Sequence, residues 1–241
     1  MNLLRSAAQD RLRALPGVSP PASLERCTTV YPQSQAAEAV YLIEDGLVKL
    51  TRSSPSGGRI ILAICGPGQL VGEEALSADA SNYYTEAVTI TPATVHRIPR
   101  QAALDALTGD GEIGRALVSY LLACKQNLAE KVELLCLHDV EHRILHYLAQ
   151  LASLLPAGEN GAGFQIPITQ LELADLIGAT RETTSTTLNQ LERRGLLKLS
   201  RRLLTVPSPD HLRSAALERI GATAAPAMQD MVNGTASSNA T

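Results

Sequence analysis

The segment from Ile168 to Gly195 constrains the fold more than any other part of this sequence, because its residues fix two short helices and the turn between them. Thr169 is followed three residues later by Glu172, which is the spacing of a capping box and begins the first helix. Gly178 can take the positive φ that a tight turn requires. Thr180 then caps a second helix, which ends with the segment. The sequence therefore predicts a helix-turn-helix.

The second helix of this pair carries polar residues first and apolar residues later. Its opening turn contains Arg181 and Glu182, and Leu188 and Leu191 mark the side that packs on the protein. Such a helix can enter the major groove of DNA with its N-terminus leading, where arginine bonds guanine O6 and N7 and glutamate accepts from cytosine N4. Ala174 in the first helix is small enough for the two helices to cross closely. The alternative is an ordinary three-helix bundle with a solvated Arg–Glu pair.

Positive charge is concentrated just after this helix pair. The chain of 241 residues has a formal net charge of −3, so a surface that binds nucleic acid must be local. The length suits two modest domains, each with its own core. Five cations lie within ten residues: Arg193, Arg194, Lys198, Arg201 and Arg202. Because such a patch attracts phosphates, we expect double-stranded DNA as a partner of this end of the chain.

The first half of the chain has the alternating pattern of short β-strands. Apolar and polar residues alternate, between turn residues, in runs that include 39–43, 47–51 and 94–98. Many short strands at regular turn spacing predict a small roll or barrel. Arg5 interrupts the N-terminus where a secretory signal would be apolar, and the longest apolar run, Ile60 to Cys65, is too short to span a membrane. We therefore expect a cytoplasmic protein with no membrane partner.

Between the predicted roll and the helix pair, the pattern changes to helical spacing. Residues 101–107 predict one helix, and apolar residues recur at helical spacing from Gly111 to Leu137. The second of these helices is much longer than the average of about 11 residues. Its apolar stripe predicts packing against its twin in a homodimer, with a core helix inside one subunit as the alternative. Asp139 then marks a hinge before a further helix, Val140 to about Leu155.

These patterns divide the chain into four parts and predict the α+β fold class. Residues 1–110 form a β-roll sensor or effector domain, with a short amphipathic helix near its start. Residues 111–138 form the dimerisation helix, and residues 139–207 form the DNA-binding domain, which ends in a β-hairpin. Residues 208–241 hold one short helix, about Asp210 to Ile220, followed by a tail of small, polar residues that we expect to be disordered.

Motifs in both halves of the chain are those of one known family. The pattern T-x-x-E-x-A-x-x-I-G-x-(S/T)-R-E-T, followed by a basic hairpin, is present with matching spacing, and the segments 45–50, 68–73 and 139–144 match roll and hinge motifs. From about Leu24 to Val206 the sequence resembles the CRP/FNR family of bacterial transcription regulators. The resemblance implies a cyclic-nucleotide-binding-like β-roll, a long dimerisation helix and a C-terminal winged helix-turn-helix.

The resemblance also assigns roles to residues of the helix pair. Arg181 and Glu182 resemble the family's base-reading pair. The family's further arginine, one turn later, is Thr186 here, so we expect a half-site that differs from the TGTGA type. The predicted base-reading residues are Arg181, Glu182, Ser185 and Thr186. The predicted phosphate contacts are Thr169, Thr180 and Thr183, joined by Arg201 and Arg202 of the basic hairpin.

The predicted roll lacks the cation with which cyclic-nucleotide-binding members hold the phosphate. Gly72 and Glu73 match the family's ribose-binding Gly-Glu, but the Arg-Ser pair about ten residues later is Tyr83-Tyr84 here. A buried phosphate without a counter-charge would cost on the order of several kcal/mol. These departures, and Leu128 in place of an adenine-contacting threonine, argue against cyclic AMP and leave the effector or cofactor unknown. The effector-pocket candidates are Gly72, Glu73, Glu74, Tyr83, Tyr84 and Leu128.

Other effectors are alternatives. The run that begins at Tyr84 is similar to cyanobacterial nitrogen-control members that bind 2-oxoglutarate, yet that anion also needs an arginine where Tyr83 stands. Three histidines follow the long helix at helical spacing: His138, His142 and His146. No carboxylate or cysteine cluster completes a site around them, so we expect no metal. A haem on His96, or a redox sensor on one of the four dispersed cysteines, is a further alternative, and buried reduced thiols are the simpler interpretation.

The expected function is sequence-specific regulation of transcription by a homodimer. Its two recognition helices would meet half-sites about one helical turn apart in a pseudo-palindromic promoter site, and the regulator would also contact RNA polymerase. An effector would act by changing the packing of the long helices. The alternatives are a ligand-independent regulator with a structural roll, or a member that senses redox state, haem or 2-oxoglutarate. No catalytic triad order, paired carboxylates or phosphate-cradling glycine loop suggests an enzyme.

Overall fold

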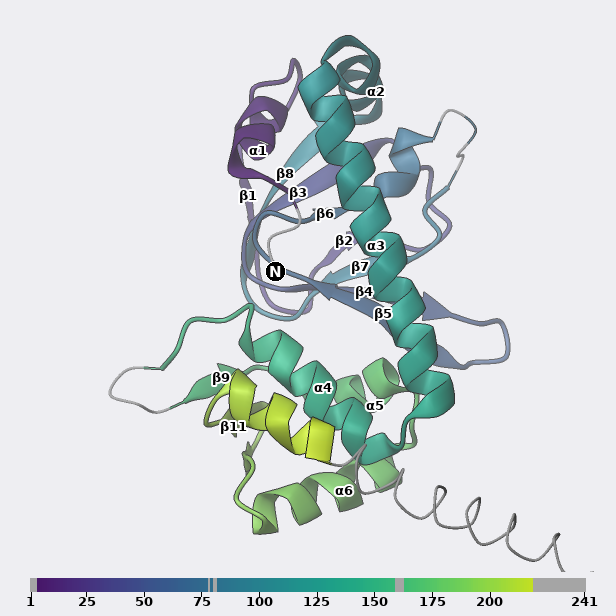
Figure 1. Ribbon diagram of the computed structural model, residues 1–241. Coiled ribbons are helices and arrows are strands. Elements are labelled where there is room, and N and C mark those ends of the chain that lie inside the picture. The colour runs from purple at the N-terminus through teal and green to yellow at the C-terminus, as the bar shows by residue number, and fades with distance from the viewer. Residues whose placement is uncertain (1–3, 78, 80–81, 159–162, 219–241) are drawn as a thin grey trace, which may run out of the picture.

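The alternating runs in the first half of the chain form a roll of two sheets (Figure 1). The structure is a computed structural model that describes residues 4–77, 79, 82–158 and 163–218. Each sheet has four antiparallel strands, in the orders β1-β8-β3-β6 and β2-β7-β4-β5. The strands are β1 (Ala22–Leu24), β2 (Thr29–Tyr31), β3 (Ala39–Asp45), β4 (Val48–Ser53), β5 (Arg59–Cys65), β6 (Leu70–Val71), β7 (Glu86–Thr89) and β8 (Ala93–Pro99).

The period of two along these strands decides which side chains face the core of the roll. On β4, Val48 and Leu50 are buried inside, whereas Lys49 between them points to the outer face. The other elements of this half are α1 (Ser6–Arg13), the short 3₁₀ helix η1 (Glu73–Leu76) and α2 (Arg100–Gly109). Helix α1 buries Leu12 against the same core. The predicted helix near the start of the chain is therefore confirmed.

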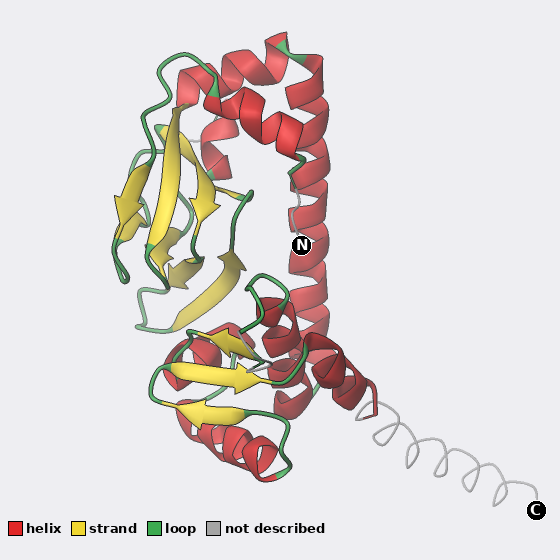
Figure 2. Ribbon diagram, turned by 90° about the vertical axis from the view of Figure 1, so that its left-hand side faces the viewer, coloured by secondary structure: helices red, strands yellow, loops and turns green. Residues whose placement is uncertain are grey.

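Helix α3 (Gly111–Leu137) runs along one side of the molecule and connects the roll to the second half of the chain (Figure 2). The Asp110 carboxylate caps its start by accepting from the amides of Glu112 and Ile113. Ile113, Leu117 and Tyr120 pack into the roll. Apolar residues stay exposed farther along the helix or on its other face: Val118, Leu121, Leu122, Leu128, Val132 and Leu137.

The second half of the chain packs three helices against a small sheet. The helices are α4 (Val140–Ala152), α5 (Gln170–Ile177) and α6 (Arg181–Arg193). The three-stranded sheet has the order β10-β11-β9 and is formed by β9 (Phe164–Ile166), β10 (Lys198–Ser200) and β11 (Leu203–Val206). Residues 209–218 are helical and contribute Leu212, Ala215 and Ala216 to the core. A helix-turn-helix followed by a β-hairpin wing is the predicted arrangement.

Two details of this half differ from the sequence prediction. Strand β9 was not predicted, because three residues are too few to show a period, and distant contacts hold the strand in place: pairing with β11 and burial of Ile166 in the core. Helix α4 ends at Ala152 rather than near Leu155, where the chain turns instead. The short helix expected at about 210–220 is observed over 209–218. The predicted disordered tail lies outside the described residues.

The two halves share a continuous contact besides α3. Ile61 on β5 is 1% exposed and belongs to the core of the second half rather than to the core of the roll. Ile64 and Leu154 pack against the same cluster. Within the described part of the chain, no helix has the length and apolar character needed to cross a membrane.

Candidate nucleic-acid interface and sensor pocket

Helix α5 begins with the predicted capping box. The Glu172 amide donates to Thr169 Oγ1 at 3.1 Å, and the Thr169 amide donates to Glu172 Oε2 at 2.9 Å. The Thr169 hydroxyl also donates to Glu172 Oε2, at 2.8 Å. Both polar groups of this predicted phosphate contact are therefore already engaged within the protein.

The turn between α5 and α6 depends on a glycine. Gly178 has a φ of 63°, the left-handed conformation that glycine adopts without a steric penalty. A Cβ atom there would also lie 2.8 Å from Cδ2 of Leu135 on α3. A side chain at this position is therefore disfavoured twice, by the backbone conformation of the turn and by the lack of space next to α3.

Helix α6 presents a polar leading turn and anchors itself behind it. The Thr180 side chain accepts from the Thr183 amide at 3.2 Å and so caps the helix. Arg181, Glu182, Thr183 and Thr186 are exposed, and Ser185 is half-buried. Leu188 and Leu191 are fully buried on the opposite side. The structure thus brings together the predicted base-reading residues on one helix, with its N-terminal end free.

Two threonines on the packing side of α6 have hydroxyls that are hydrogen-bonded. Thr184 is fully buried, and its hydroxyl donates to the Thr180 carbonyl at 2.8 Å. The Thr187 hydroxyl donates to the Thr183 carbonyl at 2.9 Å. Because each hydroxyl bonds the preceding turn of its own helix, placing these threonines on the packing side costs little solvation energy.

The turn of the wing carries two arginines. Arg201 and Arg202 form the turn between β10 and β11, and both are exposed. Arg202 has a φ of 62°, which is uncommon for a residue other than glycine. Arg194, by contrast, is neutralised by the Glu141 carboxylate at 2.6 Å. One cation of the basic patch predicted from the sequence is therefore paired with a carboxylate, although all five stay exposed.

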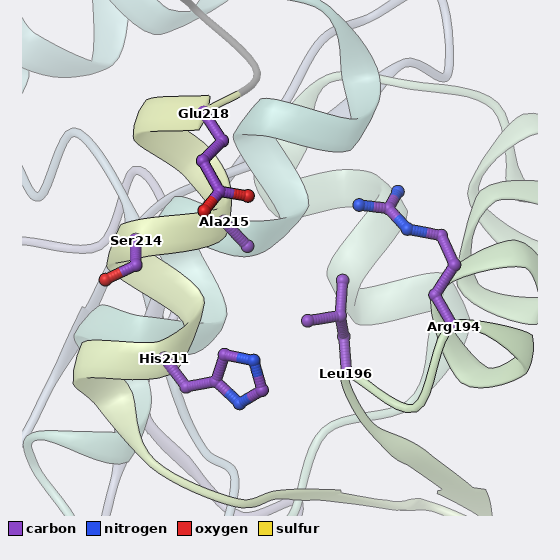
Figure 3. A pocket seen from close by; sticks show the side chains of 6 residues that line it. All are labelled: Arg194, Leu196, His211, Ser214, Ala215 and Glu218. Atoms are coloured by element: carbon purple, nitrogen blue, oxygen red, sulfur yellow. The ribbon is translucent and has the colours of Figure 1, made fainter.

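An open hollow lies at the C-terminal end of α6 (Figure 3). Arg194 and Leu196 face the helix 209–218 across it, and His211, Ser214 and Glu218 border it from that helix. Helix α6 is 13 residues long, so its leading turn lies about 20 Å away. The hollow is thus separate from the base-reading end.

Two cations that sequence reasoning missed bind the C-terminal end of α5. Lys131 of α3 donates to the Leu176 carbonyl at 2.7 Å, and Arg143 of α4 donates to the Ile177 carbonyl at 2.7 Å. Lys131 is only 3% exposed, and burial lowers its pKa to about 8. The local signal in the sequence that could have indicated this contact is Lys131 itself, a charged residue among the apolar residues of the long helix. Cations at a helix C-terminus satisfy its free carbonyls and favour its dipole.

In the roll, the Gly-Glu corner expected for a cyclic nucleotide is present. Gly72 has a φ of 80° and lies directly before η1. Glu73 follows it, and its Oε2 atom is out of contact with solvent and has no hydrogen-bond partner among the described residues. Burial raises the Glu73 pKa to about 7. This corner could accept a hydroxyl donor such as a ribose.

Tyrosines fill the position where the phosphate-binding arginine is expected. The Tyr83 ring stacks on Tyr31 with centroids 3.9 Å apart. Its hydroxyl donates to the Ala39 carbonyl at 2.7 Å and is thereby fixed to β3. Tyr84 is exposed, with the Arg52 guanidinium over its ring, and Leu128 is exposed on α3. Because a neutral, stacked side chain replaces the counter-charge, the pocket residues do not fit a cyclic phosphate.

The other sensor candidates also show no prepared site. Burial raises the pKa of the Cys65 and Cys124 thiols, which opposes the thiolate needed for redox chemistry. Cys27 and Cys136 are exposed, so the expectation of buried thiols is wrong for these two. His142 bonds the Ala216 carbonyl through Nδ1 at 3.1 Å, and His96 pairs with Glu44. No group of three or more His, Cys, Asp or Glu side chains that could hold a metal occurs in the part of the chain that the structure describes.

Comparison with known proteins identifies both halves of the chain. A Crp-like helix-turn-helix domain matches residues 142–215, and a cyclic nucleotide-binding domain matches residues 21–110. The CRP-like cAMP-activated global transcriptional regulator of Mycobacterium tuberculosis is 30% identical over 197 residues, which cover 80% of this chain and 86% of that protein. The transcriptional regulator LdrP of Thermus thermophilus is 31% identical over 195 residues, covering 80% and 93%.

Solved structures share the fold. The c-di-GMP responsive global regulator CLP of Xanthomonas campestris superposes with a TM-score of 0.71 at 23% identity, covering 84% of this chain and 99% of that one. The β-roll, the long helix and the winged helix-turn-helix therefore occur together in a known architecture. The chain belongs to the CRP/FNR family of transcription regulators, whose members bind DNA in a sequence-specific manner.

Proposed function

We propose that the protein acts as a homodimer that reads a pseudo-palindromic promoter site with Arg181 and Glu182 of each α6. The observation that carries the proposal is the free N-terminal turn of α6, whose polar residues are exposed while Leu188 and Leu191 anchor its other side. Arginine and glutamate at such a turn match the edges of guanine and cytosine. Thr180, Thr183 and the wing arginines would hold the flanking phosphates.

The exposed apolar side chains of α3 support the dimer. Val118, Leu122 and Val132 are each more than half exposed, which is unfavourable for a helix that faces water. A second copy of the same helix would cover them by coiled-coil packing. Twofold symmetry then sets two α6 helices on two half-sites, about one turn of DNA apart.

The site of action follows from this proposal. A promoter-bound dimer acts in the cytoplasm and changes initiation through contact with RNA polymerase. The protein functions by binding rather than by catalysis. Because Thr186 stands where the family's further arginine is expected, the preferred half-site differs from the TGTGA type at the position that this arginine would read.

The test is selection of duplexes from a random library with the wild-type protein, followed by titration of variants on the selected site. We expect Arg181→Ala and Glu182→Ala each to lose about 1–3 kcal/mol of discrimination at one base pair of each half-site. Arg5→Ala, at an exposed arginine before α1, is the control and should bind like the wild type. Full sequence preference in both α6 variants would refute the assignment of base-reading residues.

A second candidate is a ligand-independent regulator whose roll is structural. The tyrosine stack that fills the expected phosphate position favours it, since an anionic effector would have to displace a buried, hydrogen-bonded ring. Thermal-shift titration with cyclic AMP and with 2-oxoglutarate tests this candidate. We expect no change in Tm with either, and a rise in Tm with one of them would identify an effector instead.

A further inference from the structure

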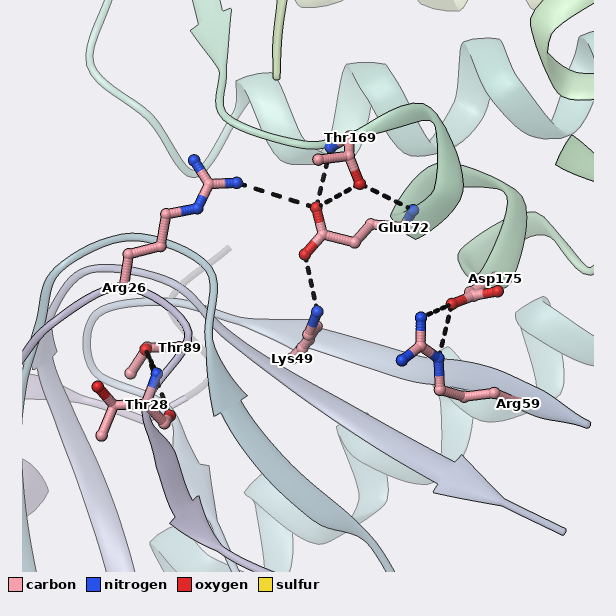
Figure 4. A network of polar contacts seen from close by, with 8 residues as sticks. All are labelled: Arg26, Thr28, Lys49, Arg59, Thr89, Thr169, Glu172 and Asp175. Carbon is pink, nitrogen blue, oxygen red and sulfur yellow. Dashed lines mark hydrogen bonds and ion pairs between the residues drawn. The ribbon is translucent and has the colours of Figure 1, made fainter. Parts of the chain in front are cut away.

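Two cations of the roll bind two carboxylates of α5 (Figure 4). Lys49 Nζ on β4 lies 2.7 Å from Glu172 Oε1, and Arg59 on β5 donates through Nε and Nη2 to Asp175 Oδ2 at 2.9 and 2.7 Å. Glu172 and Asp175 are three residues apart and therefore share one face of α5. Arg26 approaches Glu172 more distantly, at 4.0 Å. The first helix of the helix-turn-helix is thus bound to the sensor sheet.

The Lys49–Glu172 pair is shielded from water. The two side chains are only 13% and 10% exposed. Burial by itself would raise the Glu172 pKa, but hydrogen bonds from Lys49 and Thr169 outweigh it, and the pKa is lowered. Glu172 also closes the capping box of α5, so a roll residue and the start of the DNA-binding helix pair share one carboxylate.

An apolar contact lies next to the ion pairs. Strand β5 is the edge of its sheet, and α5 covers it. Ile61 of β5 is buried in the core of the DNA-binding half. We call the contact formed by Lys49, Arg59, Ile61, Glu172 and Asp175 the α5 latch. It combines a covered sheet edge, a buried side chain and two ion pairs.

The latch is the second attachment of α5. Lys131 of α3 holds the Leu176 carbonyl near the C-terminal end of α5, whereas the latch holds carboxylates on the outer face of α5, beginning with Glu172 near its start. Two attachments on an eight-residue helix, about 12 Å long, prevent rotation that either one alone would permit. Helix α6 takes no part in either attachment, although its leading turn borders an open hollow together with Arg59 and Ile60 of β5. Arg181 and Glu182 of that turn are exposed. The latched arrangement therefore leaves the base-reading turn exposed.

We propose that the α5 latch holds each DNA-binding unit in the orientation that fits the promoter, so that its opening, and not only a ligand in the roll, can switch DNA binding off. The inference rests on the proposed function. A unit released from the latch would turn about the joint at His138 and Asp139, and the two α6 helices of a dimer would lose their fixed spacing. Fixing the two released helices on DNA would cost conformational entropy, and this cost would reduce the affinity of the dimer for two correctly spaced half-sites.

The Arg59–Asp175 pair allows a sharp test, because neither residue belongs to the capping box. Arg59 and the leading turn of α6 border one open hollow of about 420 Å³, so a charge change there could also act on DNA directly. The two effects predict opposite results for Asp175→Arg. Direct attraction to phosphates would strengthen binding, whereas an open latch would weaken specific binding. The reciprocal variant R59D/D175R restores the pair and the net charge.

The experiment measures two quantities for the full-length protein. One is the ratio of affinities for the duplex selected by the wild type and for a scrambled duplex. The other is amide hydrogen exchange over residues 59–65 without DNA. We expect Arg59→Asp and Asp175→Arg each to lower the ratio on the order of tenfold, since a dimer carries two latches, and to speed exchange at the uncovered edge strand. R59D/D175R should return both quantities to within about twofold of the wild type.

Arg97→Asp is the matched control, because Arg97 is as exposed as Arg59 (42% against 43%) but lies on β8 beside Glu38. It should change neither quantity. Tighter specific binding by Asp175→Arg, an unchanged ratio in both single variants, or failure of R59D/D175R to restore them would overturn the inference. A wild-type protein without sequence preference would overturn the proposed function as well, whereas a preference that survives every variant would overturn the latch alone.

Discussion

Two glutamates of this protein, one buried and one half-buried, show how a partner decides the state of a carboxylate. Glu172 is held ionised because Lys49 and Thr169 donate to it, and its pKa is lowered. Burial instead raises the Glu73 pKa to about 7, and the Oε2 atom of Glu73 has no partner among the described residues. A glutamate side chain is therefore ionised at position 172, whereas at position 73 it titrates near neutral pH.

The raised pKa of Glu73 makes stability depend on pH. Between pH 4.5 and about 7 the folded protein keeps a proton that the unfolded chain releases, so stability is full below this window and falls as pH rises through it. Glu73→Gln removes the titration. At pH 8 we expect the free energy of unfolding of this variant to exceed that of the wild type by roughly 1–3 kcal/mol. At pH 5 the difference between the two should be at least twofold smaller.

Urea unfolding at the two pH values measures this difference. Glu25→Gln, a change at an exposed position after β1, serves as the control and should leave the difference between pH 5 and pH 8 as it is in the wild type. A Glu73→Gln variant that loses stability equally at both pH values would contradict the assignment and indicate a hydrogen bond that glutamine cannot make.

At the scale of elements, the geometry of the helix-turn-helix depends on the glycine in the turn between its helices. Gly178 adopts a φ of 63° and lies against Leu135, whereas Gly57 adopts a φ of 86° and a Cβ atom added there would meet no other atom within 4 Å. A comparison of substitutions at Gly178 and Gly57 therefore separates the cost of backbone strain from the cost of steric crowding. Both alanine substitutions should cost about 1 kcal/mol for the left-handed conformation. Gly178→Ala should cost roughly 1 kcal/mol more, because Leu135 must move.

Thermal and urea unfolding of the two variants measure these costs. The extra loss in Gly178→Ala should disappear in the background Leu135→Ala, where the methyl groups that the new Cβ meets are absent. Equal destabilisation by Gly178→Ala in both backgrounds would show that crowding against α3 plays no part at this turn.

Elements with local signals were predictable from the sequence, and elements held by distant partners were not. Thr169, Glu172 and Thr180 form the expected caps because each bonds a residue within its own first turn. Strand β9 has no local period, and its pairing with β11 decides its conformation. The bond between Lys49 and Glu172 joins residues 123 positions apart, a separation over which spacing in the sequence gives no information.

For the molecule as a whole, the proposed dimer gives a prediction. Charged residues within the exposed stripe of α3 should prevent it, since two carboxylates would be desolvated against their symmetry copies. We expect V118E/V132E to sediment as a monomer and to bind the selected duplex at least about a hundredfold more weakly, because both half-sites no longer bind together.

Leu217→Glu is the control for this variant, because Leu217 is 68% exposed and lies outside α3. It should remain dimeric and bind DNA like the wild type. A V118E/V132E protein that still sediments as a dimer would move the interface away from α3. The sequence predicted the stripe from its helical period, but the roll covers part of it, including Leu117 and Tyr120, which only the folded chain reveals.

The position of Ile61 bears on how the two halves can be taken apart. A side chain from the edge of a roll sheet completes the interior of the other half, so cutting the chain after α3 would leave a cavity on one fragment and an uncovered hydrophobic strand on the other. The intact chain should then melt in a single cooperative step. A chimera that joins the helices of the second half to the roll of a relative should be stable only where that roll has an equally bulky aliphatic residue at the position of Ile61.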